Sequence, residues 1–305
     1  MPGAGNCPRL SGTKVRKECG TFRPENKMSR WILKAANSLV NLIVILCLSV
    51  AGIYAAYALW DNNRIYSAAN DVQADMIKLK PAVVEKESGA DFSELLKVNS
   101  DVCAWVSVDN TAIDYPVLQG DTNLSYINTD VYGNFALAGS IFLDSRNNRD
   151  FSDTCSLLYG HHMENSKMFG DLDLFKEESF FFENGTGMLI LPDRICKFEI
   201  FAAILTGASE DAVFEPTYWN EGNLDELVSY VEKSAMYMRE DKLEQLTEKE
   251  DVKILLLSTC STEFTDARMI VLAMMEPDSP KNESGSPDGS QTQKGGVKPD
   301  ETENK

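Results

Sequence analysis

Histidine and basic residues are both scarce in this chain. Its 305 residues include 2 histidines, and 29 lysines and arginines stand against 47 aspartates and glutamates, so the net charge is −18. A chain this acidic repels phosphate backbones, and we expect no nucleic-acid partner. The two histidines are adjacent and no Cys-x-x-Cys pair occurs, so the common spacings of a metal site are missing. We therefore expect neither a metal nor another cofactor.

Charge is absent altogether between Ala35 and Trp60, and about 20 apolar residues suffice to span a bilayer as a helix. Residues 1–34 hold eight basic and two acidic residues; subtracting this +6 from −18 leaves −24 for the rest. The positive-inside rule then predicts a cytoplasmic basic segment (1–34), a single transmembrane helix in the cell membrane (35–60) and an extracellular remainder. A cleaved signal peptide is the alternative, because Ala56-Tyr57-Ala58 has cleavage-like spacing. The uncharged stretch is longer than the roughly 7–15 residues of a signal-peptide core, which favours the anchor.

Apolar side chains are missing from the other end of the chain. Residues 277–305 contain no aromatic residue and one aliphatic side chain, Val297. Such a segment buries too little surface to offset its ordering entropy, so we predict a disordered acidic tail. Residues 61–81 have the pattern of a polar helical stalk, and we find no internal repeat. The folded unit is therefore expected to be one domain, 82–276.

Short apolar runs alternate with turn residues inside that domain. The runs are rich in β-branched, aromatic and aliphatic residues and are bounded by Gly, Pro, Asn and Asp, which is typical of strands. Helical spacing appears in 91–98 and in 223–240. The order is not a regular strand–helix alternation, so a mainly β barrel or sandwich is predicted. The eight predicted strands are 102–108, 112–119, 140–144, 155–160, 187–192, 196–207, 252–259 and 267–275.

Cys260 is the candidate nucleophile, because it ends an apolar run and Arg268 opens the next one. A thiol nucleophile needs an acid–base partner, usually histidine, so the partner must be His161 or His162. Neighbours in extended backbone point to opposite sides, so only one of the two can face Cys260, and composition does not choose between them. The alternative is that Cys260 is a packed core thiol, as most free cysteines are. A serine hydrolase is disfavoured, because no Gly-x-Ser-x-Gly elbow occurs.

Three further cysteines are expected outside the membrane, at positions 103, 155 and 196. An oxidising exterior permits a disulfide among these three and Cys260. Each of the three lies in an apolar strand-like run, however, so we predict core packing instead.

Four ordered blocks of the sequence resemble the sortase family, class B. LLLSTCSTEFTDAR (255–268) is similar to the segment with the sortase cysteine and arginine, and LLYGHHMENSKMFGDL (157–172) to the segment with its histidine. The likeness continues in DVCAWVSVDNTAIDYPVLQGDTNLSYIN (101–128) and AGSIFLDSRN (138–147). The helix between the late strands and the N-terminal anchor also fit that family.

The resemblance implies a sortase-type eight-stranded β-barrel with peripheral helices. It also implies a cysteine transpeptidase of Gram-positive bacteria, in which Cys260 attacks the carbonyl after a threonine of a C-terminal sorting signal. By the same resemblance His161 transfers protons, Arg268 lies near the oxyanion and the backbone of Ser261 is a second oxyanion donor. The resemblance further implies three substrate-binding residues, Asn123, Ile127 and Tyr230.

The implied partners are surface proteins or pilins that carry a sorting signal, with an amine of peptidoglycan or of a pilin as acceptor. Two other functions stay open. A membrane-tethered cysteine peptidase would pass the same thioacyl intermediate to water. A non-catalytic extracellular binding module on this fold would keep its function when Cys260 is replaced by alanine.

Overall fold

The computed structural model describes residues 27–82, 90–207, 211–219, 224–248, 251–260 and 267–276. The chain divides into two compact units, 1–62 and 63–305. The predicted acidic tail, most of the predicted cytoplasmic segment and Ser261 lie outside the described residues.

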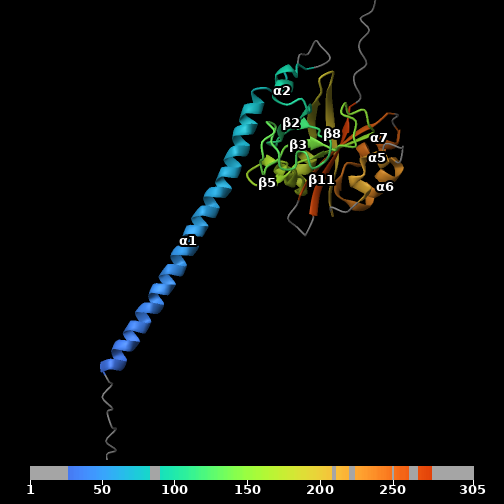
Figure 1. Ribbon diagram of the computed structural model, residues 1–305. Coiled ribbons are helices and arrows are strands. Elements are labelled where there is room, and N and C mark those ends of the chain that lie inside the picture. The colour runs from blue at the N-terminus through green and yellow to red at the C-terminus, as the bar shows by residue number, and fades with distance from the viewer. Residues whose placement is uncertain are drawn as a thin grey trace, which may run out of the picture. The chain divides into compact units, whose positions relative to one another are not determined.

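The first unit contains most of one long helix, α1 (Lys27–Ile77; Figure 1). It is the one helix among the described residues that is long and apolar enough to cross a membrane, judged by length and composition. Its apolar side chains up to Trp60 are exposed to solvent in the folded chain. The expected span 35–60 and most of the expected stalk lie within this helix, which is continuous through both.

The second unit is built on strands of one main sheet. Eight of them follow the order β11-β10-β4-β3-β2-β1-β7-β8, and β8 pairs back onto β11, so the sheet closes into a barrel. β9 adds to the free part of β8, and β5 and β6 form a separate small hairpin. The strands are β1 (Val102–Val108), β2 (Asp114–Leu118), β3 (Ile141–Leu143), β4 (Cys155–Tyr159), β5 (His162–Met163), β6 (Lys167–Met168), β7 (Thr186–Ile190), β8 (Ile195–Gly207), β9 (Ala235–Met238), β10 (Lys253–Cys260) and β11 (Ala267–Met275).

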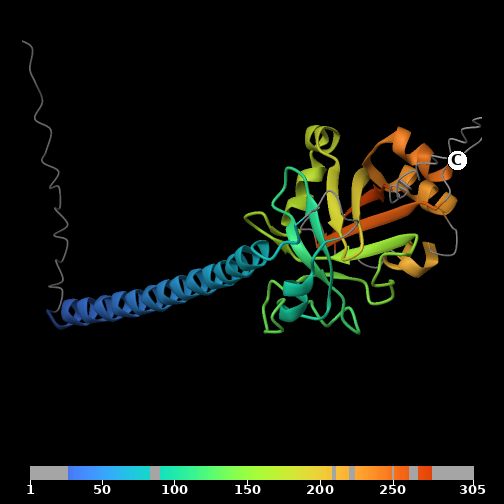
Figure 2. The same ribbon diagram turned by 90° about the horizontal axis from the view of Figure 1, so that it is seen from above.

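Short helices surround this barrel. They are α2 (Ser93–Val98), the 3-10 helix η1 (Gly170–Lys176), α3 (Glu178–Glu183), α4 (Asp211–Phe214), α5 (Pro216–Trp219), α6 (Leu224–Ser234) and α7 (Glu240–Glu248). α5, α6 and α7 gather on one flank of the barrel, where Trp219, Leu227 and Leu243 pack onto its outer face (Figure 1, Figure 2). The predicted mainly β fold with eight barrel strands and peripheral helices is thus confirmed.

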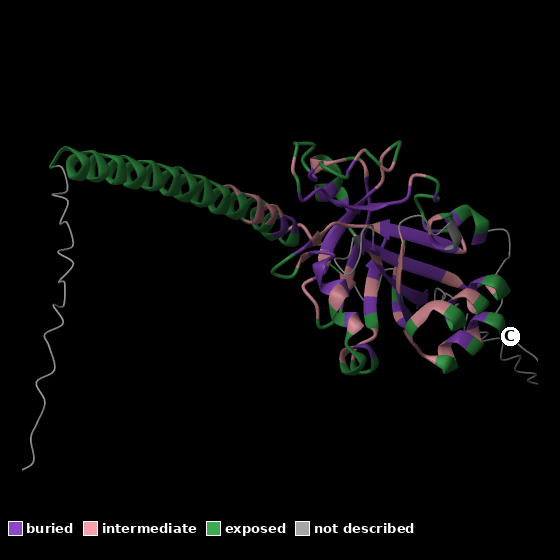
Figure 3. Cartoon of the chain, turned by 90° about the horizontal axis from the view of Figure 1, so that it is seen from below, coloured by how far each residue is buried: buried purple, intermediate pink, exposed green. Residues whose placement is uncertain are grey.

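Side-chain alternation explains why the barrel strands are apolar on both faces. On β10, Leu255 and Leu257 belong to the interior cluster, whereas Ile254 and Leu256 pack outward against the helices. Successive strand residues point to opposite faces, and here both faces are covered. Figure 3 shows these strands buried along most of their length. Burying each such side chain stabilises the fold by about 1.5–3 kcal/mol.

The helix predicted over 223–240 is only partly correct. α6 ends at Ser234, and Ala235–Met238 forms β9, which pairs with β8 through Ala202↔Met238 and Ala203↔Tyr237. β7 pairs with β8 only as far as Glu199, so the next residues of β8 expose an open edge on that side. Pairing satisfies the backbone groups of that edge, which outweighs the helical pattern of the short segment.

The cysteines at positions 103, 155 and 196 are all buried, so the prediction that they pack in the core is confirmed. Burial raises the pKa of the Cys103 thiol to about 12, and it raises the pKa of Cys155 well above its ordinary value. Because a thiolate is the reactive form, Cys103 and Cys155 are unsuited to nucleophilic chemistry.

Candidate active site

Cys260 and Arg268 are paired across the last two strands of the barrel. Cys260 is the final residue of β10, and its backbone lies opposite Arg268, the second residue of β11, in the antiparallel ladder. The strands on either side of residues 261–266 therefore bring these two positions to one edge of the sheet, as the sequence predicted.

β4 brings His161 to the same edge. It runs parallel to β10 with Tyr159 opposite Ser258, and the Gly160 backbone N–H donates to the Ser258 carbonyl at 3.1 Å. Parallel neighbours end at the same edge of a sheet. His161 and Cys260 each lie two residues beyond this Tyr159–Ser258 pair, the last pairing of β4 with β10.

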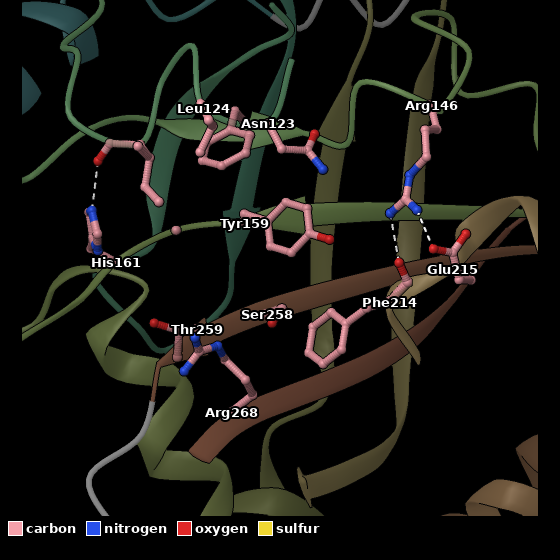
Figure 4. A pocket seen from close by; sticks show the side chains of 13 residues that line it. Asn123, Leu124, Arg146, Tyr159, His161, Phe214, Glu215, Ser258, Thr259 and Arg268 are labelled. Carbon is pink, nitrogen blue, oxygen red and sulfur yellow. Dashed lines mark hydrogen bonds and ion pairs between the residues drawn. The ribbon is translucent and has the colours of Figure 1, made fainter. Parts of the chain in front are cut away.

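A pocket of about 380 Å³ opens at this edge, lined by 13 described residues. Figure 4 shows His161, Thr259 and Arg268 at one end of the pocket and Arg146 with Glu215 at the other. Tyr159 lies between the two ends (Figure 4). The pocket therefore extends away from the His161–Arg268 end along the barrel surface.

The two histidines have different surroundings. His161 lines the pocket, and its Nε2 lies 2.7 Å from the Ile127 carbonyl oxygen. His162 is not among the lining residues; its Nε2 lies 3.0 Å from Asp173 Oδ2. Burial acts to raise the pKa of Asp173, but the bonds from His162 and Lys176 outweigh it and hold that pKa below its ordinary value. The structure thus directs the two neighbouring imidazoles to different partners.

Gly160 determines how closely His161 approaches the barrel. A Cβ at Gly160 would lie 2.4 Å from Ile141 Cδ1 and 2.8 Å from the ring of Phe169. The Phe169 N–H donates to the His161 carbonyl at 3.0 Å. Only glycine permits this close packing, which holds the backbone of His161 at the mouth of the pocket.

Two hydroxyls in the pocket lining are buried without a protein partner. Ser258 and Thr259 are 1% and 2% exposed, and within the described structure neither Oγ nor Oγ1 makes a hydrogen bond. A buried hydroxyl without a partner costs about 1–3 kcal/mol. Both groups can therefore gain from a hydrogen bond to a ligand in the pocket.

A buried carboxylate organises the opposite end of the pocket. Asp144 is fully buried and accepts hydrogen bonds from Asn123 Nδ2 (2.9 Å), Arg146 Nη2 (2.8 Å) and Tyr159 Oη (3.0 Å). Burial acts to raise the pKa of Asp144, but the bonds from Arg146 and Asn123 outweigh it and lower that pKa. Burial and the Asp144 charge raise the pKa of Tyr159, so its hydroxyl stays protonated. Arg146 also reaches Glu215 Oε1 at 2.6 Å, across the end of the pocket (Figure 4).

Comparison with known proteins identifies the family. The model of the sortase domain matches residues 106–276. The chain belongs to the sortase family. A class B sortase of Streptococcus pyogenes involved in pilus biogenesis is 36% identical with a TM-score of 0.54, over 61% of this chain and 98% of that one.

Other relatives of this sortase are also of class B. Sortase B of Clostridium perfringens is 30% identical with a TM-score of 0.55, over 61% of this chain and all (100%) of that one. Sortase B of Listeria monocytogenes is 27% identical over 237 residues, 76% of this chain and 93% of the relative. The resemblance to class B is confirmed, and the sortase is accordingly a cysteine transpeptidase.

The sortase pocket includes two of the predicted substrate-binding residues, Asn123 and Ile127. Asn123 is also held from both ends, because its Oδ1 accepts from the Ser145 N–H at 2.8 Å while its Nδ2 donates to Asp144. Its amide therefore shapes the wall of the pocket.

Tyr230 is not among the described lining residues of the sortase pocket. Its Oη donates to Thr206 Oγ1 at 3.4 Å, and Thr206 pairs with Arg268 across β8 and β11. Tyr230 is thus connected to the strand beside Arg268.

Sequence reasoning missed Arg146, Glu215 and Tyr159 as pocket residues. The sequence did contain one indication for Arg146. It comes two residues after Asp144, the last residue of a predicted strand, and this spacing favours an ion pair between the two.

No described group of three or more His, Cys, Asp or Glu side chains in this sortase is arranged to hold a metal ion.

Proposed function

We propose that this sortase is a membrane-anchored enzyme that cleaves a C-terminal sorting signal after a threonine and joins the new carboxyl end to an amine. The observation that carries the proposal is the strand register at the pocket. β4 runs parallel to β10 and ends opposite Ser258, Cys260 of β10 pairs with Arg268 of β11, and His161 and Arg268 line one pocket, which supports a joint role of His161, Cys260 and Arg268.

In the first half-reaction, the Cys260 thiolate attacks the carbonyl carbon of the threonine. The carbon–sulfur bond forms and the carbon–nitrogen bond of the peptide breaks. His161 gives its proton to the leaving amine, so the C-terminal fragment departs neutral. The guanidinium of Arg268 stabilises the negative charge on the carbonyl oxygen, with the Ser261 N–H as a second donor.

In the second half-reaction, an amine attacks the thioacyl carbon. It loses a proton to His161, the carbon–sulfur bond breaks and the Cys260 thiolate is restored. Atoms and charge balance over the cycle, since the proton lent to the first amine returns from the second.

A short peptide segment fits the pocket. Its volume of about 380 Å³ lies at the small end of the range for ligand sites, roughly 300–1,000 Å³. Ser258 and Thr259 offer unpartnered hydroxyls, and Asn123 and Ile127 line the wall. Tyr230, beside the strand of Arg268, extends the proposed contact surface. These features support a peptide substrate bound along the pocket.

The proposed location is the cell membrane of a Gram-positive bacterium, with residues 1–34 cytoplasmic, 35–60 spanning and the catalytic domain outside. Support comes from the apolar part of α1 and from the basic flank that precedes it. Proteins with sorting signals are the proposed substrates. The acceptor is an amine of peptidoglycan or of a pilin, and the pilus role of the Streptococcus pyogenes relative supports the second choice.

The test uses the full-length chain in detergent with a panel of Pro-x-Thr peptides. Intact mass spectrometry should detect an acyl adduct that is lost in Cys260→Ala and retained in the matched control Cys47→Ala. Added oligoglycine or a stem-peptide mimic should convert the adduct to an amide. Release as the free acid even with abundant amine would instead identify a peptidase. A Cys260 thiol that resists alkylation until the chain unfolds would contradict the nucleophile.

A further inference from the structure

The imidazole of His161 is bound to a backbone carbonyl. Its Nε2 lies 2.7 Å from the carbonyl oxygen of Ile127 (Figure 4, dashed line). A carbonyl oxygen can only accept a hydrogen bond, so Nε2 must carry a hydrogen. In a neutral imidazole one nitrogen carries the hydrogen and the other the lone pair. The bond to Ile127 therefore makes Nδ1 the basic nitrogen.

The Ile127 carbonyl is itself held in place by Gly139. Gly139 has φ +59°, and a Cβ there would lie 2.5 Å from the Ile127 oxygen and 2.8 Å from the Tyr126 oxygen. Glycine is the residue that combines this left-handed conformation with so close a backbone approach. The next residue, Ser140, donates its N–H to the Tyr126 carbonyl at 3.1 Å. The peptide units on either side of Tyr126 and Ile127 are thus packed against Gly139–Ser140.

Tyr126 anchors the same segment to the second unit's core. Its side chain is 6% exposed, and its hydroxyl donates to Asp101 Oδ2 at 2.7 Å and accepts from Asn99 Nδ2 at 3.0 Å. Residue 127 therefore follows a fixed residue and is backed by a glycine, so its carbonyl has little freedom to turn away from His161.

We propose that the Ile127 carbonyl, backed by Gly139, fixes the orientation and tautomer of His161, so that Nδ1 exchanges protons with the reacting amines. The inference rests on the proposed acid–base role of His161. Nε2 keeps its hydrogen throughout the cycle. Nδ1 gives a proton to the leaving amine and takes one from the incoming amine. Ile127 and Gly139 are then positioning residues. They act through His161, because the hydrogen bond from its Nε2 to the Ile127 carbonyl keeps the imidazole ring in one orientation.

The first experiment observes the tautomer directly. Full-length chain with ¹⁵N-labelled histidine is studied in detergent by long-range ¹H–¹⁵N correlation, at a pH where both imidazoles are neutral. The chain has 2 histidines, so His162→Gln assigns the remaining signal to His161. We expect Nε2 of His161 to have the shift of a protonated nitrogen and Nδ1 that of an unprotonated one. The opposite pattern would overturn the proposal.

The second experiment perturbs the carbonyl through Gly139→Ala, with Gly133→Ala as the matched control. Gly133 has φ +81° but nothing within 4 Å of an added Cβ, so its replacement introduces backbone strain without a clash. Gly139→Ala introduces similar strain and also pushes on the Ile127 oxygen. We expect kcat to fall about 10- to 100-fold further in Gly139→Ala than in Gly133→Ala, with KM little changed, because small misplacement of a catalytic group has effects of this size.

Equal kcat and an unchanged His161 tautomer in the two folded variants would overturn the positioning role of Gly139. If Gly139→Ala does not fold, the tautomer of the unaltered chain decides the matter. The two proposals are also separable. An acyl adduct with the hydrogen of His161 on Nδ1 would overturn this inference alone. No adduct, with the hydrogen on Nε2, would support the tautomer assignment and remove the proposed function.

Discussion

Cys260 and Arg268 lie directly opposite each other in the β10–β11 ladder. Arg268 lines the pocket, so the ladder places the backbone of Cys260 directly beside that of a pocket residue. This relationship follows from backbone pairing and is the geometric basis for the first prediction.

Arg268→Lys should lower kcat/KM for peptide cleavage by about 10²–10³-fold, the range for loss of one oxyanion donor. Lysine keeps the positive charge but lacks the planar fork of the guanidinium. Steady-state kinetics of the full-length chain measures this. Arg194→Lys, outside the described pocket lining, is the matched control and should leave kcat/KM unchanged. Equal activity of both variants would contradict a role for the guanidinium.

Replacement of the two histidines should have opposite outcomes. His161→Ala should reduce kcat by about 10²–10⁴-fold, the usual contribution of a general acid–base group. His162→Ala should retain activity and change the free energy of unfolding by about 0–1 kcal/mol, because its partner Asp173 is 30% exposed. Kinetics and urea unfolding of both variants test this. Loss of activity in His162→Ala with full activity in His161→Ala would reverse the assignment.

The barrel strands were predictable because each is a short apolar run between turn residues. Both faces of β10 and β11 are covered, so these runs are continuous and easily found. β9 was not predictable, because Ala235–Met238 continues the helical spacing of α6 and becomes a strand only beside the open edge of β8. That edge exists only after the barrel has closed.

The candidate site was predictable to a similar degree. Strand ends and the sortase resemblance indicated Cys260, His161 and Arg268, and the structure brings the backbones of these three positions to one edge. The Arg146–Glu215 ion pair was not predictable, since it joins residues 69 positions apart in sequence. No local pattern in the sequence encodes a contact of that separation.

Asp144→Asn should destabilise the fold by about 3 kcal/mol at neutral pH. Removing one partner of a buried ion pair costs about 3–5 kcal/mol, and the low end applies because Arg146 is 37% exposed. The pKa of Asp144 is lowered in the folded chain, so its stabilisation is present above the unfolded pKa, about 3.9, and is lost as pH falls toward the folded value. The wild type should therefore lose stability below about pH 4 more steeply than Asp144→Asn.

Urea unfolding between neutral and acidic pH measures both effects. Asp193→Asn is the control, because the Asp193 side chain is 69% exposed. It should change the free energy of unfolding by less than about 0.5 kcal/mol, as surface substitutions usually do. If the free energy of unfolding falls equally steeply with decreasing pH in the wild type and in Asp144→Asn, Asp144 does not contribute to the pH dependence.

Ser258→Ala should separate substrate binding from stability, because the Ser258 hydroxyl is buried and lacks a partner in the described structure. Removing it deletes an unsatisfied group, so the free energy of unfolding should be unchanged or slightly higher. A bound peptide that uses this hydroxyl would lose one hydrogen bond, and KM should rise about 3- to 10-fold, which corresponds to roughly 0.5–1.5 kcal/mol. Ser156→Ala is a close control: Ser156 Oγ on β4 is likewise buried without a partner, but Ser156 does not line the pocket. Both variants should unfold alike, while only Ser258→Ala raises KM; an equal KM in the two would show that the peptide does not bond to Ser258.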